Sequence, residues 1–182
     1  MNFRKALRDA AVTALADTTY GFNTKLAAEL ASASVTGHGF TIDFGATSKN
    51  FLQSYYTSWA DVDLSAVETW PAMVLYTTQY EPTQVEKFRP VSGDVLLNVD
   101  VYLSFAFRNE GGSAYGMEGN NTEDVADCVE GAIFEVFQRK ALTWPSGYTY
   151  GGLITPTREP VLQMADGYMQ RLSFQLQFEV SK

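Results

Sequence analysis

Alternation of apolar and polar positions is the clearest pattern in the chain, and it is longest between Val95 and Phe107. Every odd-numbered residue there is apolar, whereas the even-numbered set includes Asn98, Asp100 and Ser104. A period of two places successive side chains on opposite faces, so the segment is predicted to be one long strand with one buried face. At about 3.3 Å per residue it would span about 40 Å, which is long for a small domain.

Shorter strands are predicted on both sides of this segment. They cover residues 40–44, 71–77, 148–155, 160–164 and 172–180. Pro71 fits only at the start of its strand, because proline has no amide hydrogen to donate to a ladder. The charged residues 81–90 are expected to form the connection to the long strand.

Three segments have apolar residues at helical spacing, namely residues 2–16, 23–33 and 122–139. Asn23 or Thr24 is the expected N-cap of the second helix, and Thr122 that of the third. The third helix carries a continuous apolar stripe, formed by Val125, Cys128, Val129, Ala132, Ile133, Val136 and Phe137. We expect Val129, Ile133 and Val136 to pack against Val101 and Phe105 of the long strand.

The order of these elements predicts the α+β class: an antiparallel β-sheet with a long central strand and helices packed on one face. A chain of 182 residues with 46% hydrophobic content is long enough to bury a core of its own. We therefore expect one domain over residues 1–182, with an inserted arm around residues 40–69.

Charge and cysteine content restrict the classes of partner. The net charge of −8 opposes non-specific adhesion to nucleic-acid phosphates and to anionic lipid. The single cysteine cannot form an internal disulfide, and neither a signal-peptide run nor a stretch of about 20 apolar residues is present. We therefore expect synthesis inside the cell, no membrane and no specific nucleic-acid binding.

Residue types that carry catalysis are sparse. His38 is the only histidine and lies between two glycines, so a surface turn is the favoured interpretation. Cys128 lies on the apolar stripe, which favours a buried, inert thiol. Glu123 and Asp124 are explained by the positive start of their helix, and Asp127 by a solvated face. No catalytic residue, metal site or cofactor is predicted, and the chain is not expected to be an enzyme.

The glycine-rich segment 109–121 is predicted to be an adaptable contact arm. Its glycines make a fixed conformation entropically costly, whereas Tyr115 and Met117 offer apolar anchors to a partner. Asn109 and Glu110, where the segment begins, complete the predicted oligomer or partner contact. A solvent-exposed hairpin loop without a partner is the alternative interpretation.

Taken together, the segments resemble the tail terminator (tail completion) proteins of long-tailed bacteriophages. The resemblance lies in an N-terminal helix with Arg4-Lys5-Ala6-Leu7, the strand Trp70-Pro71-Ala72-Met73-Val74-Leu75-Tyr76, the long strand ending at Phe107, the helix from Thr122 to Arg139, and a terminal strand from Phe174 to Val180. A Pro-Ala pair commonly opens such a strand in that family. The second helix and residues 40–61 look like additional material.

This resemblance implies a structural virion protein, made in the host cytoplasm, that forms a homohexameric ring. The ring would cap the tail tube, contact the tail tube protein and join the neck or head–tail connector, while DNA passes through it. A phage neck or head–tail adaptor protein is the nearest alternative. A small-ligand-binding or enzymatic α+β domain, with its site under the glycine loop, and a binder of single-stranded nucleic acid are further alternatives from other classes.

Overall fold

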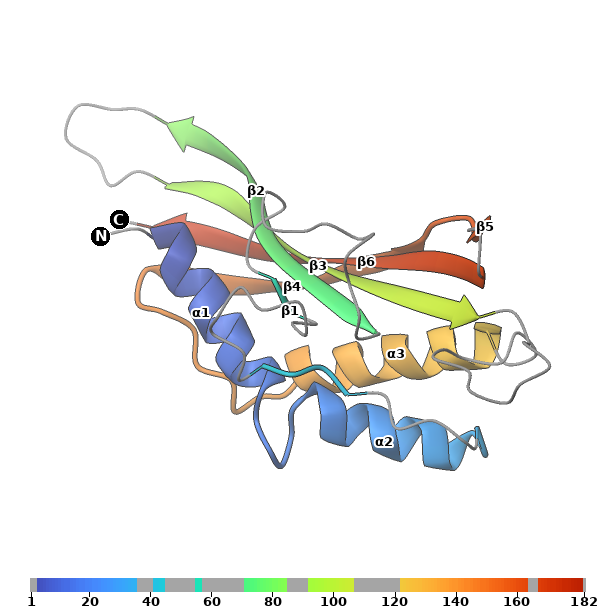
Figure 1. The fold of residues 1–182 in the computed structure, drawn as a ribbon. Helices are drawn as coiled ribbons and strands as arrows, with labels where there is room; N and C mark the ends of the chain where they lie inside the picture. Colours follow the sequence, from blue (N-terminus) through green and yellow to red (C-terminus); the bar gives the residue numbers. More distant parts are fainter. Residues whose placement is uncertain are drawn as a thin grey trace.

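A six-stranded sheet is the frame of the described part of the chain (Figure 1). The structure, a computed structural model, describes residues 3–35, 41–44, 55–56, 71–84, 92–106, 122–163 and 167–181. The strands are β1 (Tyr55–Tyr56), β2 (Ala72–Gln84), β3 (Ser92–Ala106), β4 (Tyr148–Arg158), β5 (Leu162–Gln163) and β6 (Gly167–Ser181). Their spatial order is β1-β2-β3-β6-β4, with β5 paired to β6, and every pair is antiparallel except β1 with β2.

Strand β3 is the long central strand that the alternating pattern predicts. It pairs with β2 on one side and with β6 over its whole length on the other, from Ser92 opposite Ser181 to Ala106 opposite Gly167. Outer strand β4 is irregular, with register shifts between Tyr150 and Gly152 and after Ile154. Gly152 has a φ of +125° there, a backbone conformation that favours glycine.

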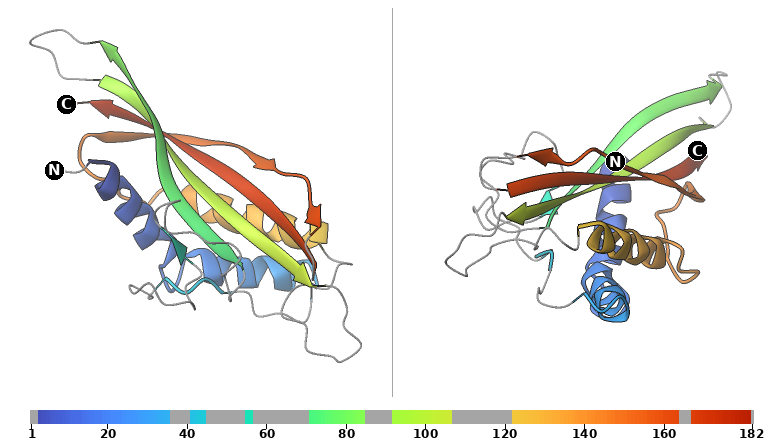
Figure 2. Two further views of the ribbon diagram at one scale, coloured as in Figure 1. Left: turned by 45° about the horizontal axis from the view of Figure 1, so that its top comes forward. Right: turned by 90° about the vertical axis from the view of Figure 1, so that its right-hand side faces the viewer.

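The helices cover one face of this sheet, as predicted. They are α1 (Phe3–Leu15), α2 (Phe22–Ser32) and α3 (Thr122–Phe137). Figure 2 shows α3 beneath the sheet and α2 beyond α3. Helix α2 packs along α3, where Lys25 pairs with Glu135 at 2.6 Å, and a side chain at Gly131 would meet the carboxylate of Glu29 at 3.1 Å. The fold is therefore α+β with the helices on one side.

Apolar side chains between the sheet and the helices form the main core. Val101 of β3 belongs to this core together with Val129, Ile133 and Val136 of α3, and each is at most 1% exposed. This part of the predicted packing is confirmed, whereas the side chain of Phe105 lies outside the described residues. The terminal strand β6 contributes every second residue from Leu172 on, namely Leu172, Phe174, Leu176, Phe178 and Val180.

Two predictions about the N-terminal half are wrong. Neither Asn23 nor Thr24 caps α2; the N-cap is Gly21, whose missing side chain lets its backbone lie against Asp17. Asn23 instead exchanges two hydrogen bonds with the backbone of Ile42, at 2.8 and 2.9 Å. Residues 41–43 have no regular structure, although a strand was predicted there; the amide of Asn23 satisfies the Ile42 backbone in place of a neighbouring strand.

Strand β2 is longer than its pattern indicates. It runs on to Gln84, so the segment that was predicted to be a connection begins inside the strand. Pro82 is accommodated at a shift of register between Pro82 and Gln84, where the ladder is irregular. Similarly, β4 continues to Arg158, past the predicted end at residue 155.

Candidate functional site

The predicted contact arm belongs to a part of the chain that the structure does not describe. Asn109, Glu110, Tyr115 and Met117 all lie outside the described residues, as does His38. Their role remains a prediction from the sequence. The described residues instead bring together two polar clusters, one beside the start of α3 and one on the sheet face away from the helices.

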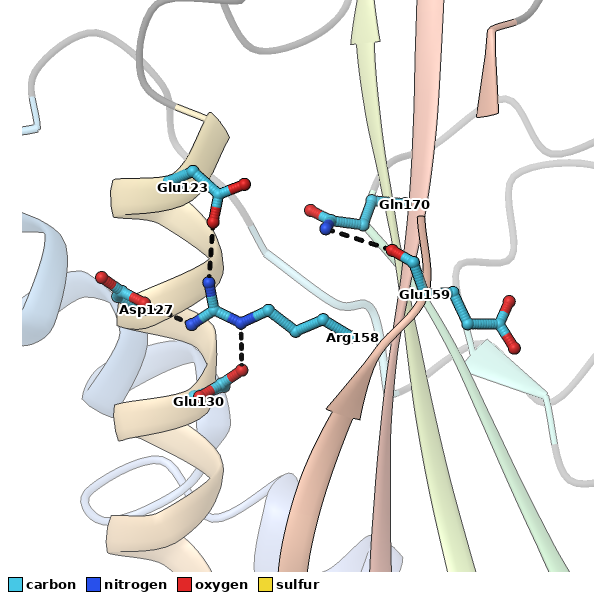
Figure 3. Close-up of polar contacts among 6 residues, drawn as sticks. All are labelled: Glu123, Asp127, Glu130, Arg158, Glu159 and Gln170. Atoms are coloured by element: carbon cyan, nitrogen blue, oxygen red, sulfur yellow. Dashed lines mark hydrogen bonds and ion pairs between the residues drawn. The ribbon is translucent and has the colours of Figure 1, made fainter. Parts of the chain in front are cut away.

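The first cluster centres on Arg158 at the end of β4. Its guanidinium donates to Glu123, Asp127 and Glu130, which lie on one side of α3 because residues three and four positions apart share a helix face (Figure 3). The Nη1–Oε2 distance to Glu123 is 2.9 Å. Three carboxylates on one guanidinium leave negative charge in excess, and they tie the end of β4 to α3.

Burial within this cluster is graded. The side chain of Glu130 is 19% exposed, compared with 68% for Asp127 and 72% for Glu123, so the ion pair becomes more shielded toward the sheet. The hydrogen bond from Arg158 to Glu130 is the main cause that raises the pKa of Arg158 further above its usual value. The solvated face that was predicted for Asp127 is confirmed, and this exposed carboxylate in addition binds Arg158.

Glu159 and Gln170 lie beside the first cluster (Figure 3). The side chain of Gln170, which is 4% exposed, donates through Nε2 to the carbonyl oxygen of Glu159 at 3.3 Å. The Glu159 carboxylate accepts from Arg171 at 2.5 Å. Arg171 therefore connects this corner of the sheet to the second cluster.

The second cluster surrounds Asp100 in the middle of β3. Asp100 is completely buried and accepts hydrogen bonds from Ser173 at 2.6 Å and from the Tyr76 hydroxyl at 3.1 Å. Its neighbour Asn98, 2% exposed, bonds to Thr78 and to Gln175 in the flanking strands. The side chains of Asn98 and Asp100 thus both find hydrogen-bond partners in the strands on either side of β3.

Burial dominates the electrostatics of this second cluster. Removal from water raises the pKa of the Asp100 carboxyl, and the bond from Ser173 and the charge of Arg171, 3.9 Å away, oppose the effect only in part. Burial likewise raises the pKa of Tyr102 to about 12. Asn98, Asp100 and Tyr102 on the even-numbered face of β3 are at most 3% exposed, so these three polar side chains are buried rather than open to solvent.

The remaining candidate chemistry is limited. Cys128 is buried as predicted, and burial raises the pKa of its thiol, which lowers the fraction of reactive thiolate. Within the described residues, no group of three or more His, Cys, Asp or Glu side chains is arranged to hold a metal ion. Among the described helices, none is long and apolar enough to cross a membrane.

Arg158 is the residue that sequence reasoning missed. Its signal was present, because acidic side chains at positions 123, 127 and 130 define one helix face that needs a cation. The identity of that cation depends on where β4 ends, and β4 was predicted to end three residues too early.

Comparison with protein-family models and with curated protein sequences finds no match for this chain.

Proposed function

We propose that the chain is a structural virion protein of long-tailed bacteriophages, a tail terminator that closes the tail tube. The observation that carries the proposal is the order and packing of its elements. Helices α1 and α2 precede a long antiparallel β2–β3 pair, α3 follows it, and the terminal strand β6 returns beside β3. This is the arrangement that the sequence resemblance implies, with every described helix on one face of the sheet.

Composition supports a ring through which DNA passes. At a net charge of −8 per copy, several copies in a ring would repel phosphate rather than hold it. The partners proposed are further copies of the chain, six in the assembled ring, together with the tail tube protein and the neck or head–tail connector. In this role the chain performs no catalysis and requires no cofactor.

The test uses the purified full chain with tubes polymerised from the tail tube protein of the same phage. We expect electron microscopy to show a closed ring of the chain on one end of each tube, and capped tubes to stop elongating. Tubes that keep growing without a cap contradict the proposal. Binding to the connector alone would instead identify the adaptor alternative.

The glycine-rich arm provides a second test. The double substitution Tyr115→Ser with Met117→Ser is expected to weaken ring formation or head joining while leaving the melting temperature of the monomer unchanged. The reason is that anchors used only on binding contribute nothing to the isolated fold. Normal assembly of infectious particles by this variant would refute a contact role for the arm.

A further inference from the structure

Charged residues of opposite sign lie at the two ends of α3, and the acidic residues further along it, Glu130 and Glu135, pair with Arg158 and Lys25. Glu123, Asp124 and Asp127 lie in its first two turns, whereas Arg139 and Lys140 follow its last residue, Phe137. A helix of 16 residues is about 24 Å long at about 1.5 Å per residue, so the two groups are well separated. The helix therefore gives the molecule an acidic end and a basic end.

At the acidic end, a buried oxygen lacks a donor. The Oε1 atom of Gln170 is buried and has no hydrogen-bond partner in the described part of the chain. The bond from its Nε2 to Glu159 fixes the orientation of the amide, since a flipped amide would set two oxygens against each other. Figure 3 shows Oε1 on the side of Gln170 that faces α3, toward the carboxylate of Glu123.

Two hydrogen-bond acceptors thus face each other from α3 and β6. A buried acceptor without a donor is unfavourable, so a donor supplied from outside would be stabilised there. Within the described residues, the three guanidinium nitrogens of Arg158 each bind a carboxylate of α3 rather than Gln170. Tyr168, two residues before Gln170 on the same face of β6, is 38% exposed and offers an apolar surface to the methylene groups of a long cationic side chain.

We infer that the acidic end binds the basic end of a second copy, with the ammonium group of Lys140 donating to Glu123 and Gln170. Lys140 is exposed, whereas Arg139 already pairs with Asp17 and lies over the ring of Tyr20. The two ends have opposite charge, so copies would join head to tail, and such a contact closes into a ring when its rotation allows.

The inference deepens the proposed function, since it names how neighbouring copies of the ring would recognise each other. Pairing of sheet edges is the competing contact, but β4 has two register shifts and Gly152 at the outer edge. Irregular edge strands of this kind resist pairing with another strand. Recognition through side chains at the ends of α3 is therefore favoured.

The experiment measures self-association of the full chain by sedimentation over a range of concentrations. Glu123→Gln, Gln170→Leu and Lys140→Gln are each expected to weaken association about tenfold or more, by removing one member of the contact. Asp124→Asn is the matched control: it makes the same charge change one residue from Glu123 and is expected to alter association less than about twofold. Glu123→Gln combined with Lys140→Gln is expected to weaken association no further than either single substitution.

Equal weakening by Asp124→Asn, or no effect of Glu123→Gln and Lys140→Gln, would overturn the inference, as would a wild-type chain that stays monomeric at every concentration. Glu123 is exposed, so its substitution tests the contact even if Gln170→Leu fails to fold. Tube capping is a separate readout. A chain that associates through these residues yet leaves tubes uncapped would support the inferred contact and contradict the proposed function. Capping of tubes by all variants would support the proposed function and contradict the inferred contact.

Discussion

On one side of β3, Val99 and Val101 lie against the helices; on the other side, Asn98 and Asp100 are buried to the same degree among polar partners. Burial of apolar surface stabilises the first face. The cost of a substitution there depends on volume and shape, because all the side chains in contact are apolar. The second face depends on pairing each donor with an acceptor, so chemistry rather than volume determines what a substitution costs. The two faces should therefore respond differently to equally small changes.

The largest effect is expected on the helix-covered face. Phe174→Ala removes a fully buried ring between the sheet and the helices and should lower the free energy of unfolding by about 3–5 kcal/mol. Urea denaturation followed by circular dichroism measures this loss. Ser173→Ala, one residue earlier on the opposite face, is the matched control, and it should cost about 1 kcal/mol because it removes one hydrogen bond. Similar losses for both would show that the faces do not differ in this way.

A charged link at the margin of the helix-covered face should come next. Arg158→Gln leaves the carboxylates of Glu123, Asp127 and Glu130 without their shared cation, and about 1–3 kcal/mol of stability should be lost. Raising the salt concentration should reduce the difference from wild type, because two of the three carboxylates are exposed. A loss that is independent of salt would indicate packing of the arginine stem instead.

On the polar face, a substitution should change how the free energy of unfolding varies with pH more than it changes the free energy at pH 7. Because burial raises the pKa of folded Asp100 above its unfolded value of 3.8, the unfolded state releases its proton first as pH rises. This group therefore favours the folded state most at low pH, and that contribution is lost as pH rises through the folded pKa. Asp100→Asn should remove this dependence of the free energy of unfolding on pH. At pH 7 it should change that free energy by about 1 kcal/mol or less, because Arg171 keeps its ion pair with Glu159 when the Asp100 carboxylate is lost. Denaturation of both proteins between pH 4 and pH 7 tests it, and parallel curves would contradict it.

The smallest effect is expected at the exposed pair of Lys5 with Asp9 in α1. Both side chains are more than half exposed, so Lys5→Gln should leave the free energy of unfolding within experimental error of wild type. Measured beside Arg158→Gln, it separates a solvated ion pair from one that several carboxylates share. A loss as large as that of Arg158→Gln would mean that exposure does not determine the strength of these pairs.

Sequence periodicity predicted the elements whose burial is one-sided. The alternation around Val101 and the helical stripe around Val129 each record a single apolar face, so β3, β6 and α3 were found with their correct orientation. Periodicity does not reveal that Asp100 is buried. A polar residue between apolar ones indicates a solvent-exposed face, whether or not other parts of the chain cover that face. Only the neighbouring strands, which bring Ser173 and Tyr76 to it, make that burial tolerable.

Termini of elements were predicted least well, and the reason is also local. Strand β2 continues through Pro82 and β4 through Pro156 because irregular pairing at each proline accommodates its missing amide hydrogen. The presence of a proline in the sequence does not indicate that the pairing there is irregular. The cap of α2 depends on the approach of Gly21 to Asp17, a contact made by chain geometry rather than by capping chemistry. The Arg158 cluster was missed because β4 was predicted to end before Pro156, whereas the strand continues to Arg158.

The full-length pairing of β3 with β6 also has a mechanical consequence. Fifteen residues of each strand lie in register, so the ladder extends about 50 Å along one direction at about 3.3 Å per residue. A force applied along that direction loads the hydrogen bonds in parallel, and the strands can separate only when many of them break together. A force across the strands would open them one at a time. The protein should therefore be stiff and strong under tension along its long axis and far weaker when peeled from one end of the ladder.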